Sequence, residues 1–203
     1  MEASITIKKI AKKYNSNTVL ADLSLGIEKG STLVLIGQNG SGKTTLLKIL
    51  SGLLEKDLGT AYINGMDIST RGSETRSITG YMPQVIDLDP NMTAMENITL
   101  FGELHNLTNK VAKENTLYWA NQFNILEYMS KIHTELCYGH QRLILFIRAI
   151  IHNPEILLLD EPTTGMDPHN RMKIWKTLDN MHNKKTILFA TQNFNEAERW
   201  AER

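Results

Sequence analysis

The sequence predicts an α/β fold whose core is a mostly parallel sheet. Three short apolar runs carry this prediction, Thr32–Ile36, Ile156–Leu159 and Thr186–Ala190. Such continuous runs are typical of strands that are covered on both faces. Helical patterns separate them, and strands that alternate with helices favour a parallel sheet. The length of 203 residues suits one domain with a substantial core, so we expect a single domain over residues 1–203.

A smaller β layer is predicted at the N-terminus. The segments Ile5–Ile10 and Leu23–Ile27 are rich in β-forming residues, and we expect them to make a small antiparallel layer. The run Thr60–Ile63 stands before Asn64-Gly65, a turn signal that predicts a hairpin arm. A further short strand is expected over Ser77–Met82.

An inserted helical subdomain is predicted in the middle of the chain. From Thr93 to Ile132 apolar side chains recur at helical spacing, and no strand signal interrupts them. We therefore expect a helical subdomain over about residues 88–153. The core would then consist of residues 1–87 and 154–203.

Further helices are predicted around these segments. A helix over Lys43–Leu54 follows the first buried run, and an apolar helix from Gly139 ends at His152, before Asn153-Pro154. Asp167-Pro168 has the pattern of a helix cap followed by proline at the first helical position. A last helix is expected from Asn193 onward.

Composition excludes several classes of protein. With 22 Lys and Arg against 22 Asp and Glu, the chain has no net attraction to nucleic acid or to an anionic membrane. Cys137 is the single cysteine, which excludes an internal disulfide framework and suits a reducing compartment. The start Met1–Ser4 lacks the pattern of a signal peptide, and the apolar run Leu143–Ile151 is too short to cross a bilayer and contains Arg148. We expect a cytosolic protein that would reach a membrane only through a partner.

A glycine-rich loop follows the first buried strand. It fits the pattern G-x-x-x-x-G-K-[ST] and lies between a strand and a helix, as phosphate binding by backbone N–H groups requires. Lys43 would reach the terminal phosphates and the Thr44 hydroxyl would ligate Mg²⁺. A chance glycine-rich turn is the weaker interpretation in this context. The predicted nucleotide-binding residues of the loop are Gly37, Gln38, Asn39, Gly40, Ser41, Gly42, Lys43, Thr44 and Thr45.

A pair of acidic residues ends the second buried run. Asp160 is the candidate ligand of Mg²⁺, commonly through water, and Glu161 is the candidate general base for an attacking water. Structural acids also end strands, but such a pair in a chain with this loop favours catalysis. The two motifs together predict a P-loop NTPase of the RecA-like type that uses a nucleoside triphosphate and Mg²⁺.

The remaining motifs resemble the nucleotide-binding domains of ABC transporters, from Ile5 to Arg203. Tyr14 matches the aromatic residue on which family members stack adenine, although it would also suit a surface turn. Gln84, in Tyr81-Met82-Pro83-Gln84, matches the glutamine that contacts Mg²⁺ or the attacking water and joins the core to the helical subdomain. Thr163–Asp167 matches the loop that meets the partner subunit in the family's dimers, although Asp167 would also suit a plain helix cap.

The signature motif departs from the family pattern. Where the family has Leu-Ser-Gly-Gly-Gln, this chain has Leu136, Cys137, Tyr138, Gly139 and His140. In the family this segment caps the other subunit's ATP with a Ser hydroxyl, glycine amides and a helix N-terminus. A thiol is a weak donor and Tyr138 adds bulk where glycine permits close approach, so we expect weak contact with a partner's ATP. A buried, inert Cys137 is favoured over an unusually acidic thiol.

The last strand leads to a second departure. Gln192 stands where the family has a histidine, and its amide can hydrogen-bond a γ-phosphate but cannot carry a proton. We therefore expect slow turnover. The chain also stops at Arg203, where family members continue through further strands, so either the chain is shortened or one edge of its sheet is open.

Three functional hypotheses follow from the resemblance. The favoured one is the ATP-hydrolysing subunit of an ABC transporter, expected to be an exporter, which acts on a separate transmembrane permease at the inner face of the cell membrane. It would work as a homodimer or, with an intact partner signature, as a heterodimer, and no nucleic acid partner is expected. The alternatives are an impaired or regulatory ATP-binding subunit and a soluble ABC protein that acts on ribosomes or nucleic acid.

Overall fold

The computed structural model describes residues 3–201. The expectations about the chain's start at Met1 and its end at Arg203 lie outside these residues. The described chain divides into two compact units. The core unit comprises residues 3–81, 155–161 and 182–201, and the helical unit comprises residues 82–154 and 162–181.

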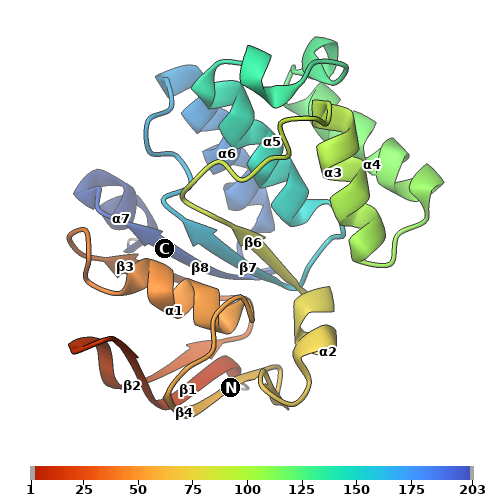
Figure 1. Ribbon diagram of the computed structural model, residues 1–203. Helices are drawn as coiled ribbons and strands as arrows, with labels where there is room; N and C mark the ends of the chain where they lie inside the picture. Colours follow the sequence, from red (N-terminus) through yellow and green to blue (C-terminus); the bar gives the residue numbers. More distant parts are fainter. Residues whose placement is uncertain (1–2, 202–203) are drawn as a thin grey trace. The chain divides into compact units, whose positions relative to one another are not determined.

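The predicted parallel sheet is present. It contains β3 (Thr32–Ile36), β6 (Thr79–Met82), β7 (Ile156–Asp160) and β8 (Thr186–Thr191), in the order β3-β8-β7-β6 (Figure 1). β8 pairs in parallel with β3 on one side and β7 on the other. Every residue of β7 and β8 is buried, which explains their continuous apolar sequences. The three apolar runs that carried the prediction are thus β3, β7 and β8.

The second β layer is also confirmed, with longer strands than expected. β1 (Ala3–Tyr14), β2 (Asn17–Glu28), β4 (Leu58–Ile63) and β5 (Met66–Asp67) form an antiparallel sheet in the order β2-β1-β4-β5. The β1–β2 pairing continues beyond the apolar segments through several register shifts, and Lys9 and Asp22 take positive φ angles of 50° and 53° there. The alternation of side chains between the two faces of a strand is interrupted at such irregularities. For this reason the sequence predicted only the apolar parts of β1 and β2.

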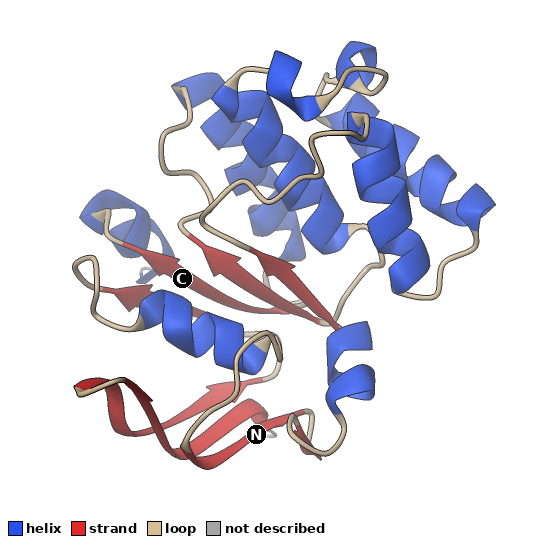
Figure 2. Cartoon of the chain, in the orientation of Figure 1, coloured by secondary structure: helices blue, strands red, loops and turns tan. Residues whose placement is uncertain are grey.

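Helix α1 (Lys43–Leu50) lies between the two β layers of the core unit (Figure 2). Leu47 and Leu50 are fully or almost fully buried in one cluster with β1, β4, β7 and β8 residues. The predicted end at Leu54 was wrong, because the helix stops at Leu50. Gly52 has φ +74°, and the amides of residues 53 and 54 bond back to the Lys48 carbonyl oxygen at 2.9 and 3.1 Å, a glycine-dependent termination.

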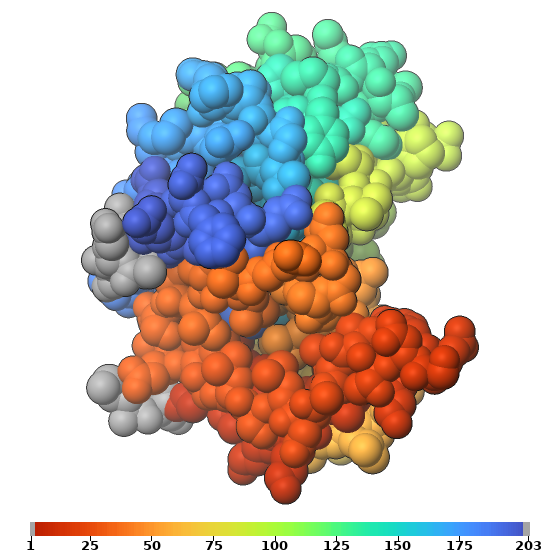
Figure 3. Space-filling view, turned by 90° about the vertical axis from the view of Figure 1, so that its left-hand side faces the viewer, coloured from red at the N-terminus to blue at the C-terminus, as the bar shows by residue number. Residues whose placement is uncertain are grey.

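Two short helices complete the core unit. A strand was predicted over Ser77–Met82, but Ser77 is the last residue of α2 (Gly72–Ser77), and β6 begins at Thr79. α7 (Phe194–Ala201) contacts β3 and β8, with Trp200 buried against Phe189. Figure 3 shows α7 in blue and the N-terminal strands in red on one face of this unit.

The helical unit confirms the helical pattern of the middle segment. It contains α3 (Ala94–Leu104), α4 (Asn109–Gln122), α5 (Tyr138–Ile150) and α6 (Pro168–Met181), with one-turn helices at Leu126–Tyr128 and His133–Glu135. Residues 162–181 group with these helices, whereas our division by sequence assigned them to the core. Among residues 3–201, the helices are too short or too polar to serve as a membrane span.

Helix starts in this unit follow local chemistry. α3 begins with a full capping box: the Thr93 hydroxyl accepts the Glu96 amide at 3.2 Å, and the Glu96 carboxylate accepts the Thr93 amide at 2.8 Å. The Glu96 carboxylate accepts from the Thr93 amide and also from the Thr93 hydroxyl, at 2.8 Å, and these two hydrogen bonds, led by that from the amide, lower the pKa of Glu96. α5 is buried on almost all sides from Leu143 to Ile150, which accounts for its apolar run.

Candidate functional site

The carboxyl ends of three strands of the core unit meet at one edge of the parallel sheet. Ile36 at the end of β3 pairs with Thr191 at the end of β8, and Asp160 at the end of β7 pairs with Ala190. The residues that follow these ends are Gly37, Gln192 and Glu161. The pairing register alone therefore brings the glycine-rich loop, the acidic pair and Gln192 to the same edge. This is the edge at which parallel α/β sheets bind their ligands.

The glycines of the loop have physical reasons to be glycines. Gly40 and Gly42 take φ angles of +82° and +94°, which L side chains rarely adopt. A Cβ on Gly42 would also stand 2.9 Å from the Val19 carbonyl oxygen, and one on Gly37 would stand 2.9 Å from Ser41 Oγ. The loop is thus a tight backbone turn with no room for side chains at Gly37 and Gly42.

Lys43 and the start of α1 supply positive charge to this turn. Gly42 is the N-cap of α1 and gives no side-chain cap, and the first-turn amides of a helix have no acceptor within it. The Lys43 ammonium lies over the loop and donates to the carbonyl oxygens of Gly37 at 2.6 Å and Gln38 at 3.0 Å. Thr44 is half-buried in the first turn. Amides, helix dipole and ammonium together make a cradle for an anion.

The acidic pair is buried at the end of β7. Asp160 is 0% exposed and Glu161 is 2% exposed. Glu161 has a positive φ of 49°, although its amide still donates to the Ala190 carbonyl oxygen at 2.9 Å. A positive φ at a residue other than glycine is costly and persists where the surroundings fix it, often at active sites. The sequence identified both acids but gave no sign of this conformation.

Gln192 and Tyr14 are exposed residues of the core unit. The turn that carries Gln192 is fixed by Thr191, whose hydroxyl donates to Glu196 at 2.9 Å and accepts the Asn193 amide at 3.0 Å. Tyr14 ends β1, its side chain is 46% exposed, and the Lys12 ammonium lies 5.9 Å from its ring centroid. An aromatic face of this kind is available for stacking.

The signature-aligned residues belong to the helical unit. Leu136 is buried, Cys137 is the exposed N-cap of α5 and forms no side-chain cap, and Tyr138 is the first helical residue. The expectation of a buried Cys137 was therefore wrong. The Tyr138 ring, 44% exposed, packs on Gly165: a Cβ there would stand 2.8 Å from Tyr138 Cε1.

Gly139 and His140 pack on neighbours within the same unit. A Cβ on Gly139 would stand 3.0 Å from Asp167 Oδ2 and from Asn170 Nδ2, so this glycine permits close packing on the start of α6. The His140 ring lies 4.3 Å from that of Tyr128. Burial lowers the pKa of His140, and the Lys173 ammonium acts in the same direction.

Asp167 caps the N-terminus of α6, as the Asp167-Pro168 pattern predicted. Its carboxylate accepts the Asn170 amide at 3.0 Å and the Asn170 side-chain amide at 2.8 Å, with Pro168 at the first position of α6. The hydrogen bond from the Asn170 backbone is the main cause of a lowered pKa of Asp167. A role of Asp167 at a dimer interface stays a prediction.

Gln84 belongs to the helical unit with an exposed side chain and a fixed backbone. Its carbonyl oxygen accepts a hydrogen bond of 2.7 Å from Arg142, whose side chain is 0% exposed. Arg142 was not among the site residues predicted from the sequence. An arginine next to the apolar run of α5 was the available signal, because a buried cation needs polar partners.

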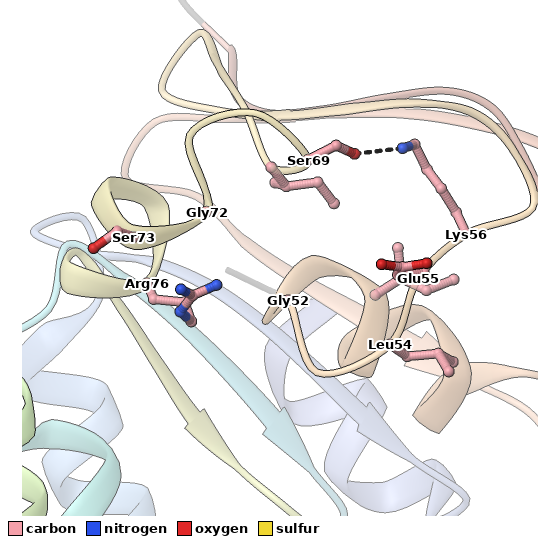
Figure 4. Close-up of a pocket in the computed structure, with 10 residues that line it drawn as sticks. Gly52, Leu54, Glu55, Lys56, Ser69, Gly72, Ser73 and Arg76 are labelled. Carbon is pink, nitrogen blue, oxygen red and sulfur yellow. Dashed lines mark hydrogen bonds between the residues drawn. The ribbon is translucent and has the colours of Figure 1, made fainter.

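A hollow of about 590 Å³ lies at the other end of α1 from the phosphate loop. Gly52, Lys56, Ser69, Gly72 and Arg76 are among its lining residues (Figure 4). The Lys56 ammonium donates to Ser69 Oγ at 2.6 Å across it. None of the predicted site residues lines this hollow.

Comparisons with known proteins identify the family of this chain. Residues 20–164 match the family model described as ABC transporter. The chain is 36% identical over 201 residues to the "Nod factor export ATP-binding protein I" of Cupriavidus pinatubonensis, covering 98% of this chain and 62% of that protein. It is also 36% identical over 204 residues to the protein of the same name from Paraburkholderia xenovorans, covering 100% and 67%. The chain thus spans about two thirds of the length of these relatives.

Solved structures share the fold. A dimeric ATP-binding cassette in a post-hydrolysis state, bound to ADP and Pi, matches with a TM-score of 0.86 at 25% identity, over 94% of this chain and 89% of that one. An ATP-binding subunit of an ABC transporter matches with a TM-score of 0.88 at 24% identity, over 97% and 82%. The predicted P-loop NTPase fold is confirmed, and the chain belongs to the ABC transporter family.

Proposed function

We propose that this chain binds and hydrolyses Mg-ATP to drive a separate transmembrane permease, as the ATP-binding subunit of an ABC transporter. The observation that carries the proposal is the strand register that brings the glycine loop, Asp160, Glu161 and Gln192 to one edge of the sheet. The relatives named for Nod factor export support an export role. The division into a core of residues 1–87 and 154–203 and a helical subdomain of residues 88–153 is part of the same proposal.

In the proposed site the loop holds the phosphates and Tyr14 stacks on the adenine. Lys43 exchanges its bonds to the carbonyl oxygens of its own loop for bonds to the β- and γ-phosphate oxygens, which offer it full negative charge. The amides of Thr44 and Thr45 add the helix dipole. Because Gly40 and Gly42 carry no side chain, the backbone there can approach the phosphates closely.

Glu161 is the proposed general base. It takes a proton from a water molecule while the water oxygen bonds to the γ-phosphorus and the bond from that phosphorus to the bridging oxygen of ADP breaks. Gln84 and Gln192 orient the water and the γ-phosphate by hydrogen bonds. Gln192 cannot accept a proton at neutral pH, so the reaction depends on Glu161 alone and is slow.

The donor set suits Mg²⁺. A buried carboxylate at Asp160, the Thr44 hydroxyl and the Gln84 amide are hard oxygen donors of the kind that Mg²⁺ takes together with phosphate oxygens and water. When bound, Mg²⁺ would neutralise charge on the phosphates. We assign Thr44, Asp160 and Gln84 to hold it.

The partners form part of the proposal. A permease subunit would anchor the chain at the inner face of the cell membrane, and two ATP-binding subunits would pair across the nucleotide. The Tyr138 ring on Gly165 occupies the position where the family's signature has glycine, and it favours a heterodimer in which a partner supplies the intact signature. The same observation, with Gln192, favours the second candidate, a regulatory ATP-binding subunit with little turnover of its own.

Mg-ATP binding and hydrolysis by the purified chain, with the Lys43→Ala variant as control, test the proposal. We expect binding that requires Lys43 and a slow, Lys43-dependent turnover. Binding without turnover would favour the regulatory candidate. A folded chain that binds no ATP, judged by its circular dichroism and cooperative melting, would overturn both.

A further inference from the structure

The segment that carries Gln84 is fixed by side chains of two helices of the helical unit. Arg142 on α5 donates from Nη1 to the carbonyl oxygens of Pro83 at 2.8 Å and Gln84 at 2.7 Å. Arg148, six residues further on α5, donates to the carbonyl oxygen of Asp87 at 3.2 Å and forms an ion pair with the Asp87 carboxylate. Asn97 of α3 pairs with the backbone of Asp89 in both directions, at 2.8 and 3.1 Å.

Of these anchors, Arg142 acts at the functional residue itself. Its side chain is 0% exposed, and Nη1 carries two hydrogens, one for each of two consecutive carbonyl oxygens. Hydrogen bonds from a charged donor in a buried place are stronger than neutral ones and fix geometry. The Gln84 side chain, by contrast, is exposed, as is that of Val85 at 72%. The backbone is held while the side chain is left available.

We propose that Arg142 is a positioning residue that holds the Gln84 backbone so that the Gln84 amide reaches the γ-phosphate and its water in the right geometry. This inference rests on the proposed role of Gln84. Arg142 lies in the second turn of α5, and the first residues of α5 are the signature-aligned Tyr138 and Gly139. Arg142 therefore connects the Gln84 backbone to the helix that begins at the signature segment. Misplacement of a water-orienting group by about 1 Å can cost on the order of 100-fold in rate.

The first test is amide hydrogen exchange of the nucleotide-free full chain, read on overlapping peptides that separate residues 82–86 from residues 87–89. Arg142→Lys keeps the charge but replaces the rigid, planar guanidinium, whose Nη1 reaches both carbonyl oxygens, with a shorter and more mobile ammonium group. We expect faster exchange near Gln84 in this variant. Unchanged exchange would overturn the anchoring, whether or not the chain hydrolyses ATP. Arg148→Lys is the matched control on the same helix and should act at residues 87–89 instead.

The second test separates positioning from a general loss of structure. Mg-ATP should protect residues 82–89 from exchange, and both Gln84→Ala and Arg142→Lys should remove that protection. Both variants should still bind ATP, because the phosphate loop is untouched. In turnover, Arg142→Lys should lower kcat on the order of tenfold with little change in KM for ATP. In the Gln84→Ala background the same substitution should have no further effect.

The double-mutant cycle gives a decisive outcome in either direction. Non-additive losses of protection and of kcat support action through Gln84, as expected for residues that work as a unit. Additive losses, or equal losses from Arg148→Lys, would mean that Arg142 only stabilises the helical unit and would overturn the proposal. If wild-type chain fails to bind Mg-ATP, the proposed function fails, whereas the exchange test on nucleotide-free chain still decides the anchoring.

Discussion

The phosphate loop of the core unit and the signature-aligned segment of the helical unit both precede a helix, yet they differ in what they offer a phosphate. At the start of α1, Gly40 and Gly42 take positive φ angles and leave the backbone bare. At the start of α5 the first helical residue is Tyr138 instead of glycine, and its ring packs on Gly165. A helix N-terminus therefore binds an anion only where the residues before it keep the backbone accessible.

The difference extends to the chemistry around each helix start. The core unit adds an ammonium at Lys43 and two buried carboxylates, Asp160 and Glu161. The helical unit adds an exposed thiol at Cys137 and a histidine whose burial lowers its pKa. We infer that the phosphate-loop site of the core unit is the functional half of the ATP-binding machinery. The signature-aligned segment, which would contact a partner's ATP, is the weaker half.

The largest expected effect comes from the functional half. Glu161→Gln should lower turnover by on the order of 10²- to 10⁴-fold, because it removes the general base, while Mg-ATP affinity stays close to wild type. Glu155→Gln is the matched control, since Glu155 precedes the opposite end of β7. Steady-state hydrolysis and equilibrium binding measure both. Equal rates for the Glu161 variant and wild type would contradict the assignment.

A smaller effect is expected from repairing the weaker half. The combination Gln192→His, Cys137→Ser and Tyr138→Gly should raise the hydrolysis rate about tenfold or more, because it restores donors toward the γ-phosphate and frees the helix start. No change in rate would show that these departures do not limit turnover.

A mixing experiment separates the effect of the signature substitutions from the effect of Gln192→His. A chain that carries Lys43→Ala together with Cys137→Ser and Tyr138→Gly cannot bind its own ATP but offers a repaired signature. Added to wild-type chain, it should stimulate hydrolysis by the wild type, whereas the Lys43→Ala chain alone should not. Stimulation by neither would argue against pairing through this face.

The packing of Tyr138 on Gly165 predicts a coupling in stability. Gly165→Ala should lower the free energy of unfolding by about 1–2 kcal/mol, because φ is +76° there and a Cβ would meet the Tyr138 ring. In the Tyr138→Gly background the steric part disappears, so the same substitution should cost less. Denaturant unfolding of the four chains measures this, and equal costs in both backgrounds would show that the ring makes no difference.

The smallest effect concerns pH. The folded-state pKa of His140 lies below its ordinary value of 6.5, mainly through burial and then through Lys173, while Asp167 and Glu127 oppose the shift. The unfolded chain then binds the proton first as pH falls. The contribution of His140 to stability is complete above about pH 6.5 and declines as the pH drops through the lower folded value. Between pH 7 and about 5, wild type should lose more stability than His140→Gln. Parallel pH profiles of melting temperature would refute this.

Much of the fold was predictable from local pattern. The runs Thr32–Ile36, Ile156–Leu159 and Thr186–Ala190 became β3, β7 and β8, because a strand buried on both faces must be apolar throughout. The end of α1 and the full length of β1 were not predictable. The first depends on the conformation of Gly52 and the second on pairing through register shifts, and neither leaves a periodic signal.

The sequence by itself determined the phosphate loop, the acidic pair and the family, because the spacing of glycines, lysine and carboxylates is what phosphate and metal binding require. Tertiary structure alone decided the backbone conformation, the exposure and the contacts of those residues and their neighbours. It gave Glu161 its positive φ, placed the Tyr138 ring on Gly165, exposed Cys137 and bonded buried Arg142 to the Gln84 carbonyl oxygen. Such contacts join residues that are distant in sequence, and packing, rather than local preference, selects them.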